Sequence, residues 1–155
     1  MEKSINLQDI IDGLEMQIDG TSTYLNLKTG EVISVSDEDV RSAEEDESFD
    51  HLPDWKQEDI KFAIDVLDNF DDYRELPTKF EINEYKLLED FCYEVKDLGN
   101  RETLFDAIRG RGAFRRFKDR VNEMGIEQEW YIFRDEQYKQ IAINWCKDHN
   151  LKYIE

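Results

Sequence analysis

Apolar side chains recur every three or four positions in several stretches of this chain, which is the spacing of one face of an amphipathic helix. The first stretch covers residues 7–14, and Asn6 before it is a suitable cap because its side chain can accept a hydrogen bond from the first turn. The same spacing recurs over residues 55–70, 82–95, 104–108, 114–124 and 138–146. The pattern therefore predicts a chain in which helices dominate.

Other short stretches have the residue types of β-strands. Residues 24–27 and 32–35 are rich in β-favouring side chains and flank a link that contains Gly30, which predicts a hairpin. Residues 129–133 are mostly aromatic or β-branched, and residues 151–154 have a similar character. We therefore expect an α+β fold: a helix-dominated single domain over residues 1–155, with an N-terminal β-hairpin and one or two short C-terminal strands.

One segment interrupts the apolar pattern. Residues 36–53 carry eight acidic side chains against one arginine. A charge run of this kind is normally solvated surface. We therefore expect a mobile acidic connection at about residues 36–53, within a chain whose 155 residues suit one domain.

The charge of the chain is strongly negative and unevenly distributed. It holds 38 acidic and 20 basic side chains, a formal net charge of −18, and this surface disfavours broad binding to nucleic acid or anionic membranes. The first 100 residues hold 28 acidic and 9 basic side chains, whereas the last 55 hold 10 and 11. Within that second part, residues 109–120 gather six basic side chains. A small cationic region therefore lies in an acidic protein.

The sequence also indicates a compartment. No apolar run reaches the length of a membrane span, and the first ten residues lack the apolar core of a signal peptide. Cys92 and Cys146 do not form a C-x-x-C pair and lie in amphipathic stretches. We therefore expect two reduced core thiols in a cytoplasmic protein that has no membrane partner.

Four short motifs give the chain a family resemblance. They are residues 24–25 with 29–32 (YL and TGEV), 73–77 (YRELP), 110–118 (GRGAFRRFK) and 130–133 (WYIF). With these motifs the sequence resembles a bacterial family, uncharacterised protein family 0158, over most of its length, and residues 110–118 are the most specific part. The resemblance implies a cytoplasmic, bacterial, single-domain protein. It brings no activity with it, so the function stays open.

The cationic region combines two glycines with a helix start. Gly110 and Gly112 allow a tight turn, after which the first amides of the helix and its positive dipole end could face an anion. Arginine side chains beside such a helix start offer forked donors to phosphate or carboxylate. We therefore predict a recognition element for an anionic ligand or a partner. Its candidate residues are Arg109, Gly110, Arg111, Gly112, Arg115, Arg116, Lys118 and Arg120.

Three alternatives remain open. The arginines could pair with the protein's own carboxylates, and the glycines would then form a tight joint between two helices. The chain could be an acidic interaction module that docks a basic partner through residues 37–50. It could also be a small enzyme that depends on carboxylates, although its sequence contains no nucleophile elbow, P-loop, G-x-G-x-x-G or H-E-x-x-H motif. Our leading hypothesis is a non-enzymatic binding or regulatory protein.

Metal ligands at the usual spacings are missing from the sequence. The acidic run contains no calcium-loop pattern. His51, His149, Cys92 and Cys146 supply zinc-type donors, but Cys146 and His149 are the only close pair among them. Cys146 also belongs to an apolar stripe, which favours a place in the core. We therefore expect no metal and no cofactor, and a partner that is an unknown protein or a small anionic ligand.

Overall fold

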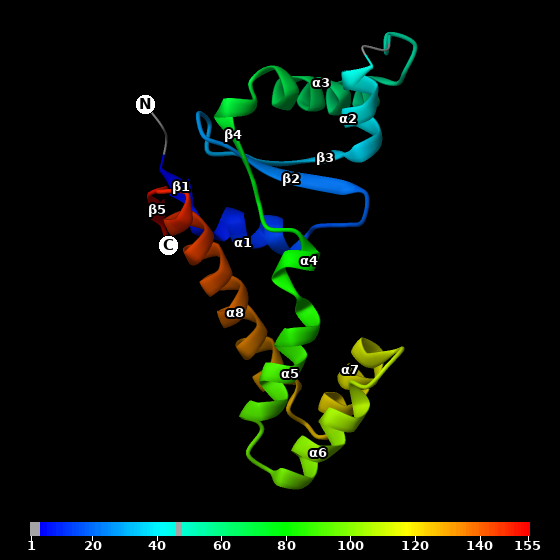
Figure 1. The fold of residues 1–155 in the computed structure, drawn as a ribbon, viewed down its shortest axis with the longest axis vertical. Helices are drawn as coiled ribbons and strands as arrows, with labels where there is room; N and C mark the ends of the chain where they lie inside the picture. Colours follow the sequence, from blue (N-terminus) through cyan, green and yellow to red (C-terminus); the bar gives the residue numbers. More distant parts are fainter. Residues whose placement is uncertain (1–3, 46–47) are drawn as a thin grey trace. The chain divides into compact units, whose positions relative to one another are not determined.

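The computed structural model describes residues 4–45 and 48–155 and is drawn in Figure 1. The chain divides into two compact units: unit 1 comprises Met1–Lys79 and Ala142–Glu155, and unit 2 comprises Phe80–Ile141. Helices account for most of the regular structure, and the described strands lie in unit 1. The α+β, helix-dominated class is therefore confirmed, and the expectation of a single domain stays a prediction.

Unit 1 is built on a three-stranded antiparallel sheet with the strand order β3-β2-β4. The strands β2 (Thr21–Asn26) and β3 (Val32–Ser36) form the hairpin that the sequence predicts, with Tyr24 opposite Ile33. The strand β4 (Tyr73–Glu75) pairs with the other edge of β2. The central strand β2 therefore has a hydrogen-bonded neighbour on each side.

Helices cover both faces of this sheet. Figure 1 shows α1 (Leu7–Glu15) on one face, and α3 (Asp54–Asp68) with α2 (Asp37–Glu44) on the other. The 3-10 turn η1 (Phe70–Asp72) leads from α3 into β4. The apolar side chains buried in unit 1 include Ile10, Leu14, Leu25, Val35, Ile60, Val66 and Leu76.

The two ends of the described chain also pair. The strand β1 (Ile5–Asn6) runs parallel to β5 (Tyr153–Ile154), which confirms a short C-terminal strand at the predicted place. Trp145 lies in the part of unit 1 that follows residue 142, and its Nε1 donates a hydrogen bond to the carbonyl oxygen of Glu75 over 3.1 Å. These contacts attach the C-terminal segment to the sheet.

Gly13 shows why α1 contains a residue that disfavours helix. An ideal Cβ at this position would lie 2.9 Å from Cγ1 of Val32 and 3.0 Å from Cδ2 of Leu76. Those distances are shorter than ordinary carbon contacts. The missing side chain therefore lets the helix backbone approach the sheet closely, at a conformational cost of about 1 kcal/mol relative to alanine.

The acidic segment contains a helix that its charge pattern does not indicate. In α2, the Oγ atom of Ser36 accepts a hydrogen bond from the amide of Asp39 over 3.0 Å, which caps the first turn. Acidic residues in the first turn suit the positive end of the helix dipole, so a run of carboxylates can also be a helix start. Residues 46–47 of the predicted connection lie outside the described residues. The mobility of the rest of the connection stays a prediction.

Unit 2 consists of helices. After α4 (Lys79–Ile82) come α5 (Glu84–Glu94), α6 (Leu98–Ala107) and α7 (Ala113–Glu123). The last helix, α8 (Glu127–Asp148), contributes residues 127–141 to this unit. Their inward faces supply a core that is rich in aromatic side chains.

The centre of that core is a cluster of edge-on aromatic rings. Phe117 is fully buried, and its ring centroid lies 4.8 Å from that of Trp130 and 5.9 Å from that of Phe91. Phe133 joins the cluster 5.5 Å from Phe91. Edge-to-face contacts of this kind stabilise packing beyond the area they bury. They hold α5, α7 and α8 together around the site described below.

The predicted strand at residues 129–133 is wrong, because these residues lie within the first two turns of α8. β-propensity is a weak signal that depends on context. Over a longer window, Trp130, Tyr138, Ala142 and Cys146 are all buried and are separated by multiples of four positions. That helical spacing extends through residues 129–133 and outweighs the local preference for strand.

Candidate binding site

The predicted cationic region begins at a tight turn between α6 and α7. Gly110 and Gly112 have φ angles of 71° and 77°, in the left-handed region that glycine enters without strain. Gly112 is the N-cap of α7, and no side chain caps this helix start. The two glycines therefore make the sharp change of direction that the sequence suggests.

Arg116 folds back onto this turn. Its Nε atom donates a hydrogen bond to the carbonyl oxygen of Ala107 over 2.8 Å, and its two terminal nitrogens donate to the carbonyl oxygens of Arg109 and Arg111. The carbonyls at the end of a helix lack partners within the helix, so a guanidinium there satisfies them and suits the negative dipole end. Arg116 is thus bound to the backbone of the turn.

The guanidinium of Arg116 gives a second reason why position 112 is a glycine. An ideal Cβ at position 112 would lie 2.9 Å from Nη1 of Arg116. Any side chain at this position would therefore strain the backbone and force the guanidinium to shift from its place. Gly112 leaves room for the guanidinium of Arg116, and Arg116 in turn stabilises the backbone of the turn.

The other predicted cations divide into two groups. Arg109 pairs with Asp106 at 3.7 Å and Arg120 pairs with Glu123, each three residues away and well exposed, so both pairs contribute little stability. Arg111, Arg115 and Lys118 are exposed, and none of them forms an ion pair with any residue in 4–45 or 48–155. These three charges are available to a ligand.

Lys118 is the predicted cation that reaches a pocket. The pocket has a volume of about 510 Å³ and lies between α5, α7 and α8. Phe114 and Tyr131 are 47% and 44% exposed at its edge, and the buried rings of Phe117 and Trp130 lie deeper. The remaining lining residues are Glu84, Leu87, Leu88 and Arg134. The volume is that of a small-molecule site.

A polar cluster lies at one side of the pocket. Tyr138 donates a hydrogen bond from its hydroxyl to Oε1 of Glu84, and Nη2 of Arg134 lies 3.4 Å from the same oxygen. The guanidinium of Arg134 also lies 4.3 Å above the ring of Tyr138. The charge of Glu84 thus balances that of Arg134. Lys118 then gives the lining one excess positive charge, in a protein whose net charge is −18.

Sequence reasoning missed Arg134 and Glu84. They are 50 positions apart, and neither belongs to a motif that specifies a site. Phe114 was visible as part of an apolar stripe, but nothing in the spacing shows that it lies half exposed beside a pocket. One sequence feature does indicate part of the pocket: Phe114 and Lys118 are four residues apart on α7 and therefore share one face of the helix.

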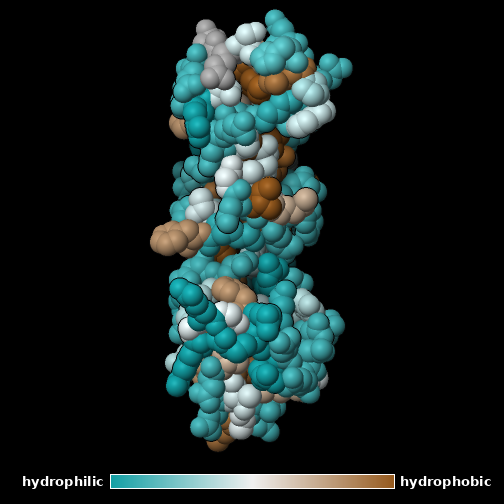
Figure 2. Space-filling view, turned by 90° about the vertical axis from the view of Figure 1, so that its right-hand side faces the viewer, coloured by the Kyte–Doolittle hydropathy of each residue, from teal (hydrophilic) through white to brown (hydrophobic). Residues whose placement is uncertain are grey.

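One face of the molecule is mainly hydrophilic (Figure 2). Figure 2 shows one face of the molecule, on which hydrophilic residues form most of the surface and hydrophobic residues appear in separate patches. On this face, apolar contact with a ligand or a partner is therefore confined to small areas.

No metal centre emerges from the part of the chain that the structure describes. Within residues 4–45 and 48–155, no three His, Cys, Asp or Glu side chains lie close enough together to hold an ion. Both cysteines are free and buried, and burial raises the pKa of the Cys92 thiol to about 11 and also raises the pKa of Cys146. Among the described residues, no helix combines the length and the apolar character that crossing a membrane requires.

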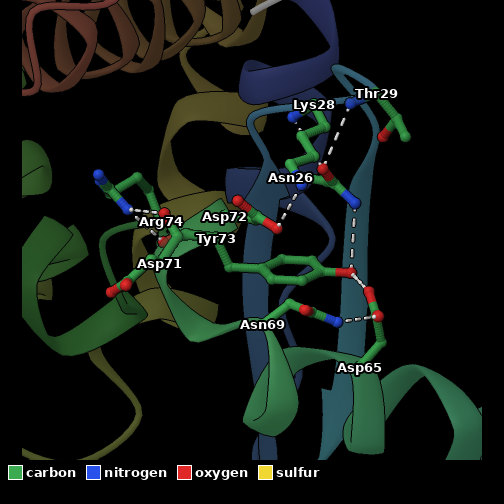
Figure 3. A network of polar contacts seen from close by, with 9 residues as sticks. All are labelled: Asn26, Lys28, Thr29, Asp65, Asn69, Asp71, Asp72, Tyr73 and Arg74. Carbon is green, nitrogen blue, oxygen red and sulfur yellow. Dashed lines mark hydrogen bonds and ion pairs between the residues drawn. The ribbon is translucent and has the colours of Figure 1, made fainter.

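The motif at residues 73–77 lies at a polar network in unit 1, drawn in Figure 3. The hydroxyl of the buried Tyr73 donates to Oδ2 of Asp65 and accepts a hydrogen bond from Nδ2 of Asn26 over 3.2 Å. Nδ2 of Asn69 donates to the other oxygen of Asp65 over 2.7 Å. The network joins α3, β4 and the end of β2, so Tyr73 has a structural role.

Replacing Tyr73 with phenylalanine is expected to lower the free energy of unfolding by about 1–2 kcal/mol, because Asp65 and Asn26 lose a partner in a half-buried place. Burial, and then the hydrogen bond to Asp65, raise the pKa of Tyr73 to about 12. Its stabilising contribution is therefore complete below pH 10 and is lost as the pH rises towards 12. Urea unfolding at neutral pH and at pH 11 measures both effects.

The matched control is Tyr93→Phe. Tyr93 is exposed and packs its ring against Phe105, so the loss of its hydroxyl should change the stability by less than about 0.5 kcal/mol. Equal effects of the two substitutions would contradict the role given to the Tyr73 network.

The two units define an acidic α+β protein with an aromatic, cation-lined pocket in its helical unit. The chain belongs to the Uncharacterised protein family (UPF0158), whose family model matches residues 3–155. It is 27% identical over 145 residues to a UPF0158 protein of Pseudomonas aeruginosa, and the match covers 92% of this chain and 83% of that relative. No solved structure shows a significant match to the chain. The family resemblance of the sequence motifs is thus confirmed.

Proposed function

We propose that the protein is a non-enzymatic cytoplasmic binding protein whose unit 2 recognises an organic anion with an apolar body. The ligand is either a small molecule or an acidic side group of a partner. The observation that carries this proposal is the pocket between α5, α7 and α8, in which the half-exposed ring of Phe114 lies one helical turn from Lys118, whose ammonium group has no ion-pair partner among the described residues.

The chemistry of the pocket supports a mixed ligand. The rings of Phe114, Trp130 and Tyr131 offer apolar contact, and Trp130 and Tyr131 also carry a polar group at the edge of the ring. Lys118 supplies the excess positive charge, because Arg134 is already paired with Glu84. An anion without an apolar part would leave the aromatic wall unused.

The surrounding charge restricts which anions can bind. The chain as a whole carries a net charge of −18, so a long polyanion meets repulsion along most of its length. A single carboxylate, sulfonate or phosphate group meets the local field of Lys118, with Arg111 and Arg115 nearby in sequence. This supports a small recognition site within the predicted cationic region.

The alternative function, docking of a basic partner through the acidic residues 37–50, gains no specific support. Asp39 is 3% exposed and paired with Lys56, so one carboxylate of the run is unavailable to a basic partner. No observation favours the carboxylate-dependent enzyme over the binding protein.

Anilinonaphthalene sulfonate is a suitable first probe because it joins an anionic group to an apolar body. We expect the wild-type chain to enhance its fluorescence, and Lys118→Gln to weaken its binding by about tenfold through the loss of the charge in the pocket. Phe114→Ala should weaken binding by a similar factor because the aromatic wall is lost. Fluorescence titration measures both dissociation constants.

Arg120→Gln is the matched control, since it removes one positive charge from the same helix at a residue that does not line the pocket. Its dissociation constant should stay within about twofold of the wild-type value. Unchanged binding to Lys118→Gln, or equal losses in Lys118→Gln and Arg120→Gln, would overturn the proposed site.

A further inference from the structure

Unit 2 carries a second pocket with the opposite charge. It lies between the end of α5, the start of α6 and the first half of α8, and its volume is about 630 Å³. Ile132 is 56% exposed there, which is unusual for an isoleucine in the middle of a helix. The apolar lining consists of Phe91, Val95, Ile126, Ile132 and Phe133. We refer to this pocket, with its apolar and acidic lining, as the acidic groove.

Carboxylates surround this apolar lining. The acidic lining residues are Glu94, Asp97, Glu129 and Glu136, and Lys96 is the one basic side chain among the described residues that line the pocket. None of the four acids forms an ion pair with a residue of 4–45 or 48–155. Arg101, on α6, donates hydrogen bonds to the carbonyl oxygens of Val95 and Tyr93 and forms no ion pair with these acids.

The backbone places these groups in a regular order along α8. Glu129, Ile132, Phe133 and Glu136 are separated by three, one and three positions, so they lie on one face of the helix. The two glutamates are two turns apart, which is about 10 Å along the axis. An apolar centre thus lies between two negative ends.

We propose that the acidic groove docks a basic amphipathic helix of a protein partner. Apolar side chains of such a helix fill the space around Ile132 and Phe133, and lysine or arginine residues two turns apart meet Glu129 and Glu136. Recognition of this kind combines a helix-in-groove contact with charge complementarity.

The charges of the chain favour a basic helix over other occupants of the acidic groove. A second copy of the chain carries the same net charge of −18, so self-association through four carboxylates meets repulsion. Phosphate backbones are repelled by the same residues. A simple cation would find carboxylates in the groove but would leave its apolar lining exposed.

Binding can be measured with a synthetic helical peptide of leucine and lysine in amphipathic order. A fluorescein-labelled peptide is titrated with the full-length chain, and fluorescence anisotropy gives the dissociation constant at low and at physiological salt. A leucine–glutamate peptide of the same order and a scrambled leucine–lysine peptide are the comparison probes. We expect binding of the ordered basic peptide alone, and weaker binding as salt rises.

The decisive variant is Glu129→Lys with Glu136→Lys, in which the charges of both glutamates that α8 contributes to the acidic groove are reversed. It should raise the dissociation constant of the basic peptide by at least about tenfold. The control is Asp119→Lys with Asp135→Lys, which gives the same net charge at exposed residues outside the lining of the acidic groove. This control should change the constant by less than about twofold at physiological salt.

The apolar part of the proposal has its own variant. Ile132→Ala shortens an exposed side chain, so it should leave the fold intact and still weaken peptide binding several-fold. Far-UV circular dichroism verifies that each variant is folded. Anilinonaphthalene sulfonate binding should be unchanged in Ile132→Ala, which separates the acidic groove from the pocket of Lys118.

Several outcomes would overturn the proposal. These are the absence of peptide binding to the wild-type chain, equal losses in the two double variants, and equal binding of the scrambled peptide. A concentration-dependent dimer that Glu129→Lys with Glu136→Lys abolishes, measured by light scattering after gel filtration, would assign the acidic groove to a second copy of the chain instead.

Discussion

Replacing Lys56 with alanine is expected to lower the free energy of unfolding by about 3 kcal/mol. The Nζ atom of Lys56 lies 2.6 Å from Oδ1 of Asp39, and the side chains are 23% and 5% exposed. This pair joins α3 to α2. Without the ammonium group, the carboxylate of Asp39 remains between the two helices with no opposite charge, and burying an unpaired charge is costly. Urea unfolding followed by circular dichroism measures the loss.

Two further variants separate the ion pair from packing. Lys61→Ala removes a lysine of the same helix whose pair with Glu58 spans 3.5 Å between exposed groups, and should cost less than about 0.5 kcal/mol. The double variant Asp39→Asn with Lys56→Met removes both charges, and should recover most of the loss. If the double variant were as unstable as Lys56→Ala, packing and not the ion pair would account for the effect.

The pH dependence of the stability is an independent test of the ion pair between Asp39 and Lys56. The hydrogen bond to Asp39 raises the pKa of Lys56 above its ordinary value of 10.5, although burial acts in the other direction. A lysine whose pKa is higher in the folded state stabilises fully below the unfolded pKa and loses this contribution as the pH rises through the folded pKa. The stability difference between the wild type and Lys56→Ala should therefore narrow above about pH 10.5.

The elements that the sequence predicts correctly are those whose signals are local. The hairpin of β2 and β3 depends on β-favouring runs around Gly30, and its turn is closed by the side chain of Asn26, which accepts hydrogen bonds from the amides of Lys28 and Thr29. The start of α1 depends on Asn6, which caps the amide of Gln8 over 2.9 Å as expected. In both cases the residues that decide the structure are within a few positions of one another.

The strand predicted at residues 129–133 failed because a window of five residues reports propensity but not packing. Trp130 is buried against Phe117, which is thirteen positions earlier in the chain, and that contact requires the helical spacing of α8. The pocket that Lys118 lines also depends on contacts between residues that are far apart in the sequence. Its polar cluster joins Glu84 to Arg134 across 50 positions, so no local pattern could reveal it.

The cationic region shows what residue type alone leaves undecided. Arg115 and Arg116 are adjacent arginines with identical chemistry, and the sequence places both in one anion site. In the structure Arg115 is exposed, whereas Arg116 reaches three backbone carbonyl oxygens. Their difference arises from the direction of the two side chains on α7, about 100° apart around the helix.

Arg116→Ala is therefore expected to lower the free energy of unfolding by about 2–3 kcal/mol, because three carbonyl groups of the turn lose a charged donor. Arg116→Lys should be nearly as unstable, since one ammonium group cannot reproduce the forked geometry of a guanidinium. Arg115→Ala, the matched control, should change the stability by less than about 0.5 kcal/mol. Chemical unfolding of the three variants gives the comparison.

The same three variants decide how the most specific motif of the chain is to be understood. If Arg116→Ala is unstable and Arg115→Ala is not, Gly112 and Arg116 are a structural pair within residues 110–118, and Phe114 and Lys118 of this motif remain in the proposed site. If Arg116→Ala keeps the wild-type stability but loses binding of anilinonaphthalene sulfonate, Arg116 is a ligand residue. The glycines alone would then hold the turn. The guanidinium of Arg116 would be free to leave the carbonyl groups and bind an anion.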